Sequence, residues 1–306
     1  MTPGVKLGVK LELSLTVRGA LWMMGSTASW ASMAAITRHF TGEIHVFEIV
    51  FFRSIFGMIF ILPWLFGAGL GGLRTQRTGM HMARGFIGLG VIYILFTAIT
   101  LAPMGEVAAI ISTRPVIASL AAVIILHEIA SGRRWTATIL GFAGALLIVR
   151  PGFSEVSTGT ILALISVIFM AALTIIIKSL ARTEAPDTIV VWQMVVFAPC
   201  SLIPALFVWQ TPDLWQFILL ASTGLFGTLT QRCLTRSYAA ADATAVLPFD
   251  FTRLIFAAAL GYILFEEFPD IWTWAGGTLI FIAVLWMTRG ESKSETPEKA
   301  PVKVEH

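Results

Sequence analysis

The chain has 306 residues, of which 57% are hydrophobic and only 13% are charged, and its formal net charge is +3. Soluble domains have about 45–50% apolar and about 25% charged residues, so this composition excludes an ordinary water-soluble domain. The basic balance does not indicate a nucleic-acid partner, because the positive charges lie in short segments between apolar runs. Two cysteines and five scattered histidines form neither a disulfide framework nor a metal motif, so we expect no metal and no cofactor.

Ten apolar segments follow one another along the chain, and a helix that crosses a bilayer needs about 20 such residues. In chain order they are 19–37, 46–68, 82–101, 104–126, 135–150, 158–178, 188–209, 213–231, 243–265 and 271–288. Turn residues such as Pro186-Asp187 and Pro212-Asp213 mark the breaks between them. The sequence therefore predicts an all-α membrane protein with ten transmembrane helices and a disordered polar tail at 290–306.

Lysine and arginine are distributed unevenly between the two sets of loops. The alternate set contains only Arg38 and Arg150. The other set, with the two termini, contains fifteen: Lys6, Lys10, Arg18, Arg74, Arg77, Arg133, Arg134, Lys178, Arg182, Arg232, Arg236, Arg289, Lys293, Lys299 and Lys303. Because positive loops stay in the cytoplasm, this bias predicts a multi-pass protein with both termini cytoplasmic.

The two halves of the chain repeat at an offset of 139 residues. At this offset Thr113-Arg114 corresponds to Thr252-Arg253, Glu128 to Glu267 and Trp135 to Trp274. The repeats are residues 19–150 and 158–289, with five predicted spans each. Since five is odd, the second copy must be inverted in the membrane. Inverted repeats are typical of secondary transporters, whose substrate site lies near the midplane between the halves.

Four ionisable residues lie well inside the predicted spans: Arg53, Arg114, Asp250 and Arg253. A charge at the centre of a membrane helix costs about 2.5–3.5 kcal/mol, so such residues face the bundle interior or water. Two guanidiniums at repeat-equivalent positions would bind a carboxylate or a phosphate of the substrate. Alternatively Asp250 and Arg253, at i and i+3, form a salt bridge. Asp250 is also a candidate for proton coupling, for which a permanent salt bridge is the alternative.

Uncharged residues inside the spans complete the predicted substrate site. Trp30, Tyr93 and Phe249 can stack on a planar ligand, and Gln193 can fix its orientation. For Trp30, plain packing or a place in the interfacial belt is the favoured alternative to ligand contact. Arg84 lies near a cytoplasmic end, from which we expect its side chain to snorkel.

Several motifs resemble the drug/metabolite transporter superfamily, specifically its ten-span members with paired EamA-type domains. They are Met82-Ala-Arg-Gly, Ser112-Thr-Arg-Pro-Val, Gly141-Phe-Ala-Gly-Ala, Leu247-Pro-Phe-Asp-Phe-Thr-Arg253 and Phe265-Glu-Glu-Phe-Pro-Asp270. The second-half motifs are similar to the bacterial branch that includes riboflavin, S-adenosylmethionine and metallophore transporters. The resemblance covers residues from about 19 to 289.

The resemblance implies a non-enzymatic protein of the bacterial inner membrane. We expect it to carry a small organic metabolite, such as a vitamin or an amino-acid-derived or anionic compound, by alternating access around a midplane cavity. Small residues of the fifth and tenth spans allow close packing, and the resemblance makes these spans a candidate homodimer surface: Gly141, Gly144, Ala145, Gly276 and Gly277. The alternatives are an intramembrane enzyme, for which no nucleophile–base set is apparent, and a channel or scaffold.

Overall fold

The computed structural model describes residues 15–40, 43–68, 73–101, 110–111, 113–149, 157–266 and 271–294. Within these ranges the chain is helical apart from turns and connections, and no strand occurs. The helices are α1 (Leu15–His39), α2 (Val46–Ala68), α3 (Thr78–Leu101), α5 (Arg114–Leu126), α6 (Gly132–Val149), α7 (Thr158–Ala181), α8 (Pro186–Leu206), α9 (Leu214–Ala240), α10 (Ala243–Val246), the 3₁₀ helix η2 (Leu247–Phe251), α11 (Thr252–Phe265) and α12 (Ile271–Ser294).

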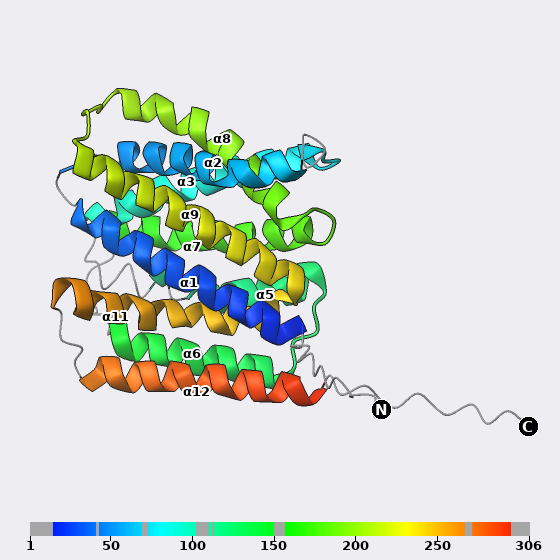
Figure 1. Cartoon of the computed structure of the whole chain (residues 1–306). Coiled ribbons are helices and arrows are strands. Elements are labelled where there is room, and N and C mark those ends of the chain that lie inside the picture. The colour runs from blue at the N-terminus through cyan, green and yellow to red at the C-terminus, as the bar shows by residue number, and fades with distance from the viewer. Residues whose placement is uncertain are drawn as a thin grey trace, which may run out of the picture.

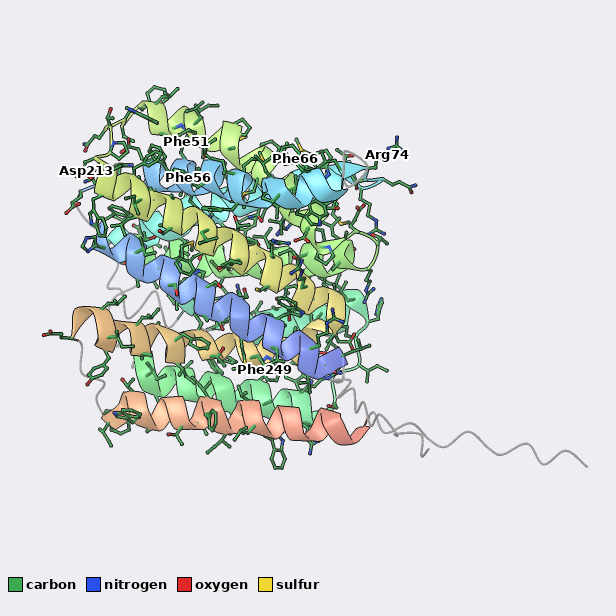
Figure 2. All side chains as sticks on the ribbon, viewed as in Figure 1. Phe51, Phe56, Phe66, Arg74, Asp213 and Phe249 are labelled. Carbon is green, nitrogen blue, oxygen red and sulfur yellow. The ribbon has the colours of Figure 1, made fainter. Side chains whose placement is uncertain are left out.

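The long helices run along a common direction and form one bundle (Figure 1). In this view α2 and α8 lie at one side, α6 and α12 lie at the opposite side, and α1, α7 and α9 lie between them. Arg74 and Asp213 mark the two opposite ends of the bundle (Figure 2).

Six helical segments of the described chain are long and apolar enough to cross a membrane. They are Val46–Gly67, Thr78–Leu95, Thr158–Ala181, Pro186–Leu206, Leu214–Ala240 and Ala243–Leu264, and two further apolar helices, Arg114–Leu126 and Ile271–Trp286, are shorter. An all-helical membrane protein is therefore confirmed, whereas the full number of ten spans stays a prediction. The predicted tail lies outside the described residues beyond Ser294.

The helix contacts follow the two halves of the sequence. In the predicted repeats α1 corresponds to α7 and α3 to α9, and the structure contains both of the related contacts, α1 with α9 and α7 with α3. The same holds for α1 with α11 and α7 with α5. Helices α6 and α12, which correspond to each other, pack together. Each of these contacts in one half therefore has a counterpart in the other, as two related repeats would give.

Backbone conformation also repeats between the halves. Helix α5 ends at His127 (φ 54°) and α11 ends at Glu266 (φ 55°), and among the described non-glycine residues these two have positive φ. They are 139 residues apart, as are the first residues of α6 and α12. A left-handed residue at a helix end turns the chain sharply into the next helix. The fourth predicted helix of each half therefore ends in the same backbone conformation.

The predicted segment 243–265 is a broken helix, with α10 and η2 preceding α11. Pro248 has no backbone donor, and the chain adopts a 3₁₀ turn at this point. Two buried side chains form hydrogen bonds with the backbone groups that the helix ends on either side of Asp242 leave without helical partners. The Lys178 ammonium donates to the Tyr238 and Ala241 carbonyls at the end of α9. The Glu128 carboxylate accepts from the amides of Ala243 and Thr244 at 3.0 and 2.9 Å.

The eighth predicted span ends too early, because we assigned Arg232 and Arg236 to a loop. Helix α9 continues to Ala240, so both arginines lie in its last turns. Asp187, in the first turn of α8, accepts from Arg232 at 2.5 Å and from Arg236 at 2.9 Å. This shared carboxylate offsets the two charges and lets the helix continue. Lys178 likewise lies inside α7 rather than in a loop.

Two glycines of the fifth and tenth predicted spans, Gly144 and Gly276, lie between α6 and α12 of the same chain. A Cβ added to Gly144 would meet the Gly276 carbonyl oxygen at 2.7 Å, and one added to Gly276 would meet the Gly144 oxygen at 2.4 Å. The two helices therefore touch backbone to backbone, a close approach that membrane helices use in place of a hydrophobic driving force. Gly277 faces open space, so only the outer faces of these helices are free for the predicted homodimer.

We expect Gly276→Ala to destabilise the protein by about 1–3 kcal/mol, because the added methyl group meets backbone that cannot move without separating α6 from α12. Thermal unfolding of purified protein in lipid nanodiscs measures the effect. Gly277→Ala is the matched control, since nothing lies within 4 Å of its added Cβ. Equal unfolding temperatures for the two variants would contradict this packing.

Candidate functional site

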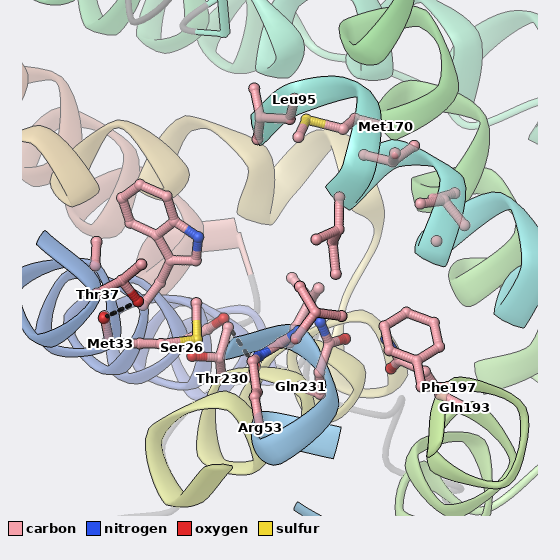
Figure 3. A pocket seen from close by; sticks show the side chains of 18 of the residues that line it. Ser26, Met33, Thr37, Arg53, Leu95, Met170, Gln193, Phe197, Thr230 and Gln231 are labelled. Atoms are coloured by element: carbon pink, nitrogen blue, oxygen red, sulfur yellow. Dashed lines mark hydrogen bonds between the residues drawn. The ribbon is translucent and has the colours of Figure 1, made fainter. Parts of the chain in front are cut away.

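A cavity of about 480 Å³ lies between the halves of the bundle, with walls from α1, α2, α3, α5, α7, α8, α9 and α11. Most of its lining is apolar, including Met33, Leu95, Met170 and Phe197, which face the same space as Gln193 and Gln231 (Figure 3). Four arginines also line it: Arg53, Arg84, Arg114 and Arg253. The cavity thus combines an apolar interior with several fixed positive charges.

Asp250 connects two of these arginines. One carboxylate oxygen lies 2.6 Å from a terminal nitrogen of Arg114, and the other lies 2.8 Å from one of Arg253. The Asp250 side chain is only 6% exposed, and it projects from the 3₁₀ turn at the break before α11. The repeat-equivalent arginines thus meet at one carboxylate, and the Asp250–Arg253 ion pair, one of the two alternatives from the sequence, is present. Contact of the two arginines with a substrate stays a prediction.

Arg253 has a second partner in α1. Its guanidinium carbon lies 4.5 Å from the ring centre of Trp30, which is a cation–π distance. The Thr27 hydroxyl, on the same helix, lies 2.9 Å from the hydroxyl of Thr252. Helix α1 therefore holds the start of α11 by an aromatic face and a hydrogen bond, which fixes the direction of the Arg253 side chain.

The prediction that the Arg84 side chain snorkels toward the cytoplasmic end is wrong. Its side chain is 2% exposed and points into the bundle, where it donates to the Ile189 carbonyl at 2.6 Å and to the Gln231 side-chain oxygen at 3.1 Å. Sequence reasoning missed this residue because it stands near the beginning of a span. The available signal was Gln231, a polar residue deep in an apolar helix that needs a partner.

Arg53 stands apart from the other three arginines. It is 8% exposed, and no hydrogen bond or ion pair joins it to the described part of the chain. A Cβ added to Gly227 would lie only 2.7 Å from the Arg53 Nε atom. The absence of a side chain at Gly227 therefore makes room for the guanidinium. The contact joins α2 to α9.

The remaining predicted residues divide into two groups. Gln193 and Trp30 line the cavity, and the Gln193 side-chain oxygen is buried without a hydrogen-bond partner in the described part of the chain. Phe249 and Tyr93 are not part of the lining. Phe249 is 1% exposed and packs in the layer between α1 and α6 (Figure 2), and the Tyr93 ring packs edge-on against Phe47 with centroids 5.1 Å apart.

The described lining of the cavity extends to the end of the bundle where α1 joins α2. Its lining includes Phe40 and Ile44 from the connection between α1 and α2. Toward the opposite end, polar contacts join neighbouring helices: Asp187 with Arg232 and Arg236, and Arg134 with Asp242 at 3.3 Å. None of the residues that form these pairs belongs to the described lining, although Leu234, between Arg232 and Arg236 on α9, does. Ion pairs thus join α8 to α9 at the end of the bundle where α8 begins.

Comparison with known proteins identifies relatives along most of the chain. Residues 17–150 and 157–289 each match the EamA-like transporter family. A riboflavin transporter of Rhizobium johnstonii is 31% identical over 290 residues, which cover 93% of this chain and 95% of the relative. An S-adenosylmethionine uptake transporter of Rickettsia prowazekii is 28% identical over 282 residues, with 92% and 96% covered.

A solved crystal structure has the same fold, with a TM-score of 0.77 over 91% of this chain and 99% of the other. Its sequence identity is 14%, so this likeness concerns the fold alone.

We expect Asp250→Asn to destabilise the bundle by about 3–5 kcal/mol, because it leaves two buried guanidiniums together without their shared carboxylate. Thermal unfolding in nanodiscs measures the loss. The double variant Asp250→Asn/Arg114→Gln removes one of the uncompensated charges, so it should lose less than the single variant. If Asp250→Asn unfolds at the temperature of the wild type, the ion pairs do not hold the two halves.

Proposed function

Because this chain belongs to the EamA-like transporter family, we propose that it is a secondary active transporter that moves a small organic metabolite through the central cavity. The relatives are named as transporters and not as enzymes. The cavity supports this proposal most directly, because about 480 Å³ falls in the range of sites that enclose a small molecule. The substrate would be bound where residues from both halves of the bundle meet.

The cavity lining carries information about the substrate class. Riboflavin, which names one relative, is an uncharged planar molecule, and S-adenosylmethionine, which names the other, carries a sulfonium cation. The described lining contains four guanidiniums, and a single carboxylate contacts two of them. This excess of positive charge disfavours a cationic substrate. We therefore propose a neutral or anionic substrate with an apolar or aromatic body, which Trp30 and Phe197 would contact.

We propose alternating access, with the end that holds the Asp187 ion pairs as the closed end of the cavity and the end at the α1–α2 connection as the open one. The cavity extends toward the α1–α2 connection, and ion pairs of Asp187 join α8 to α9 at the other end. In the proposed cycle, one repeat rocks against the other, so that the ion pairs separate and the open end closes around the substrate.

The membrane arrangement completes the proposal. We place the chain in the bacterial inner membrane with ten spans, two inverted repeats at 19–150 and 158–289, and both termini in the cytoplasm, which is the arrangement that the bias of positive loops favours. The closed end would then face the cytoplasm. A homodimer would use the outer faces of α6 and α12, where Trp272, Trp274 and Phe281 are exposed.

We expect counterflow in proteoliposomes to identify the substrate. Vesicles preloaded with an unlabelled vitamin, amino acid or carboxylate should accumulate the labelled compound transiently when it is the substrate. A channel gives equilibration without this overshoot, and an enzyme returns a converted compound.

Once the substrate is known, Arg253→Ala should raise the apparent KM for that substrate at least tenfold, since it removes the cation that Asp250 and Trp30 hold at the cavity wall. An unchanged KM would remove Arg253 from the site.

We expect Asp187→Asn to loosen the closed end, because Arg232 and Arg236 lose their shared acceptor. Cys233, beside Arg232 on α9, reports this opening in a Cys200→Ala background. Its labelling by a membrane-impermeant maleimide, added from the side of Asp187, should become several-fold faster. Asp213→Asn, at the opposite end of α9, is the control and should leave the labelling rate unchanged. Identical rates for both variants would show that these pairs are not a gate.

A further inference from the structure

The charges around the cavity do not balance. The described lining contains four arginines and no acidic residue, and Asp250, which lies behind it, contacts only Arg114 and Arg253. Even with Asp250 counted, the site has three more positive than negative charges. A buried charge without a partner is costly in a low-dielectric interior. Such an imbalance in a cavity calls for a negative ligand.

The four arginines differ in how far they are already occupied. Arg114 and Arg253 share the Asp250 carboxylate, and Arg253 also stacks on Trp30. Arg84 uses both terminal nitrogens in hydrogen bonds to Ile189 and Gln231. These contacts hold their guanidiniums in place. Each of the three would have to leave a partner before it could bind a ligand with its full set of donors.

Arg53 has no such partner in the described chain, although it is 8% exposed and lines the same cavity. The bare backbone at Gly227 makes room for its guanidinium on one side, so its position is set by packing rather than by a counter-ion. A guanidinium held in this way presents a planar fork of donors, which fits a carboxylate or phosphate in a two-point contact.

We infer that Arg53 binds an anionic group of the substrate, a carboxylate or a phosphate, and that the substrate itself neutralises the cavity. This inference rests on the proposed transport function and makes it more specific. Arg114, Asp250 and Arg253 then form the framework that joins the halves, while the apolar wall holds the rest of the molecule. The substrate is an organic anion with an apolar or aromatic body.

The first test needs no knowledge of the substrate. Removal of an unpaired buried charge should leave the empty protein as stable or more stable, so Arg53→Met is expected to raise its unfolding temperature by a few degrees or leave it unchanged. The measurement uses wild type and variant in phosphatidylcholine nanodiscs without added ligand. A fall of several degrees would show that Arg53 has a structural role and would overturn the inference.

The second test uses inorganic phosphate as the probe. At constant ionic strength, phosphate in place of chloride should raise the unfolding temperature of the wild type, and Arg53→Gln should abolish the rise. Arg133→Gln, which removes an arginine that stacks on Trp286 outside the cavity, is the control and should retain it. No Arg53-dependent rise would overturn the inference. The inference would also be overturned if phosphatidylglycerol in the nanodiscs, without added phosphate, gave the same Arg53-dependent rise, because the site would then bind a lipid headgroup.

The third test compares neutral compounds with their acidic counterparts in counterflow: riboflavin with riboflavin 5′-phosphate, nicotinamide with nicotinate, and pantothenol with pantothenate. We expect at least a tenfold preference for the acidic member of a transported pair, and loss of that preference in Arg53→Gln. Gly227→Ala, which keeps the charge but displaces it, should weaken the preference, whereas Gly277→Ala should not.

The outcomes separate this inference from the proposed function. Transport of neutral members alone, unaffected by Arg53→Gln, would overturn the inference and keep the transporter. Conversion of a compound, or equilibration without overshoot, would overturn the transporter, while the phosphate measurement still tests Arg53 as an anion site.

Discussion

The contact of Asp250 with one guanidinium from each half of the chain is the interaction around which the cavity is arranged. Arg114 begins α5 and Arg253 lies in the first turn of α11, so a single carboxylate ties together the two corresponding helices. The contact is possible because the helix before α11 is broken, which brings the carboxylate of the 3₁₀ turn between the two arginines. Charges that would be costly in a bilayer thereby form buried ion pairs, one of which links the two halves of the chain.

The same break depends on two charged residues that lie elsewhere in the sequence. Glu128 and Lys178 satisfy the backbone groups freed near Asp242, one at the amides of α10 and the other at the carbonyls of α9. Both side chains are buried. A broken membrane helix is stable only where other groups replace the missing hydrogen bonds. The positions of these two residues therefore belong to the architecture of the central site.

Apolar length and turn residues predicted the helices well where they act alone: α2 has the predicted bounds 46–68. They placed the end of α9 too early, because Arg232 made the segment look like a loop. Its partner Asp187 lies on another helix, and the sequence around Arg232 does not show this ion pair. The Arg114–Arg253 relation was accessible through the repeat. The contact of Arg53 with Gly227 was not, since it depends on how α2 packs against α9, and no periodicity in either segment encodes that.

The repeat symmetry that predicts the central site is broken at its centre. Shifted by 139 residues, Asp250 corresponds to Ile111, which lines the cavity on the other half. The arginines are duplicated, but the carboxylate is not. Two identical units exchanged by a two-fold axis would present the same groups to the central site from both sides. An acidic side chain without a counterpart removes that equivalence, so the charge arrangement of the site distinguishes one half of the chain from the other.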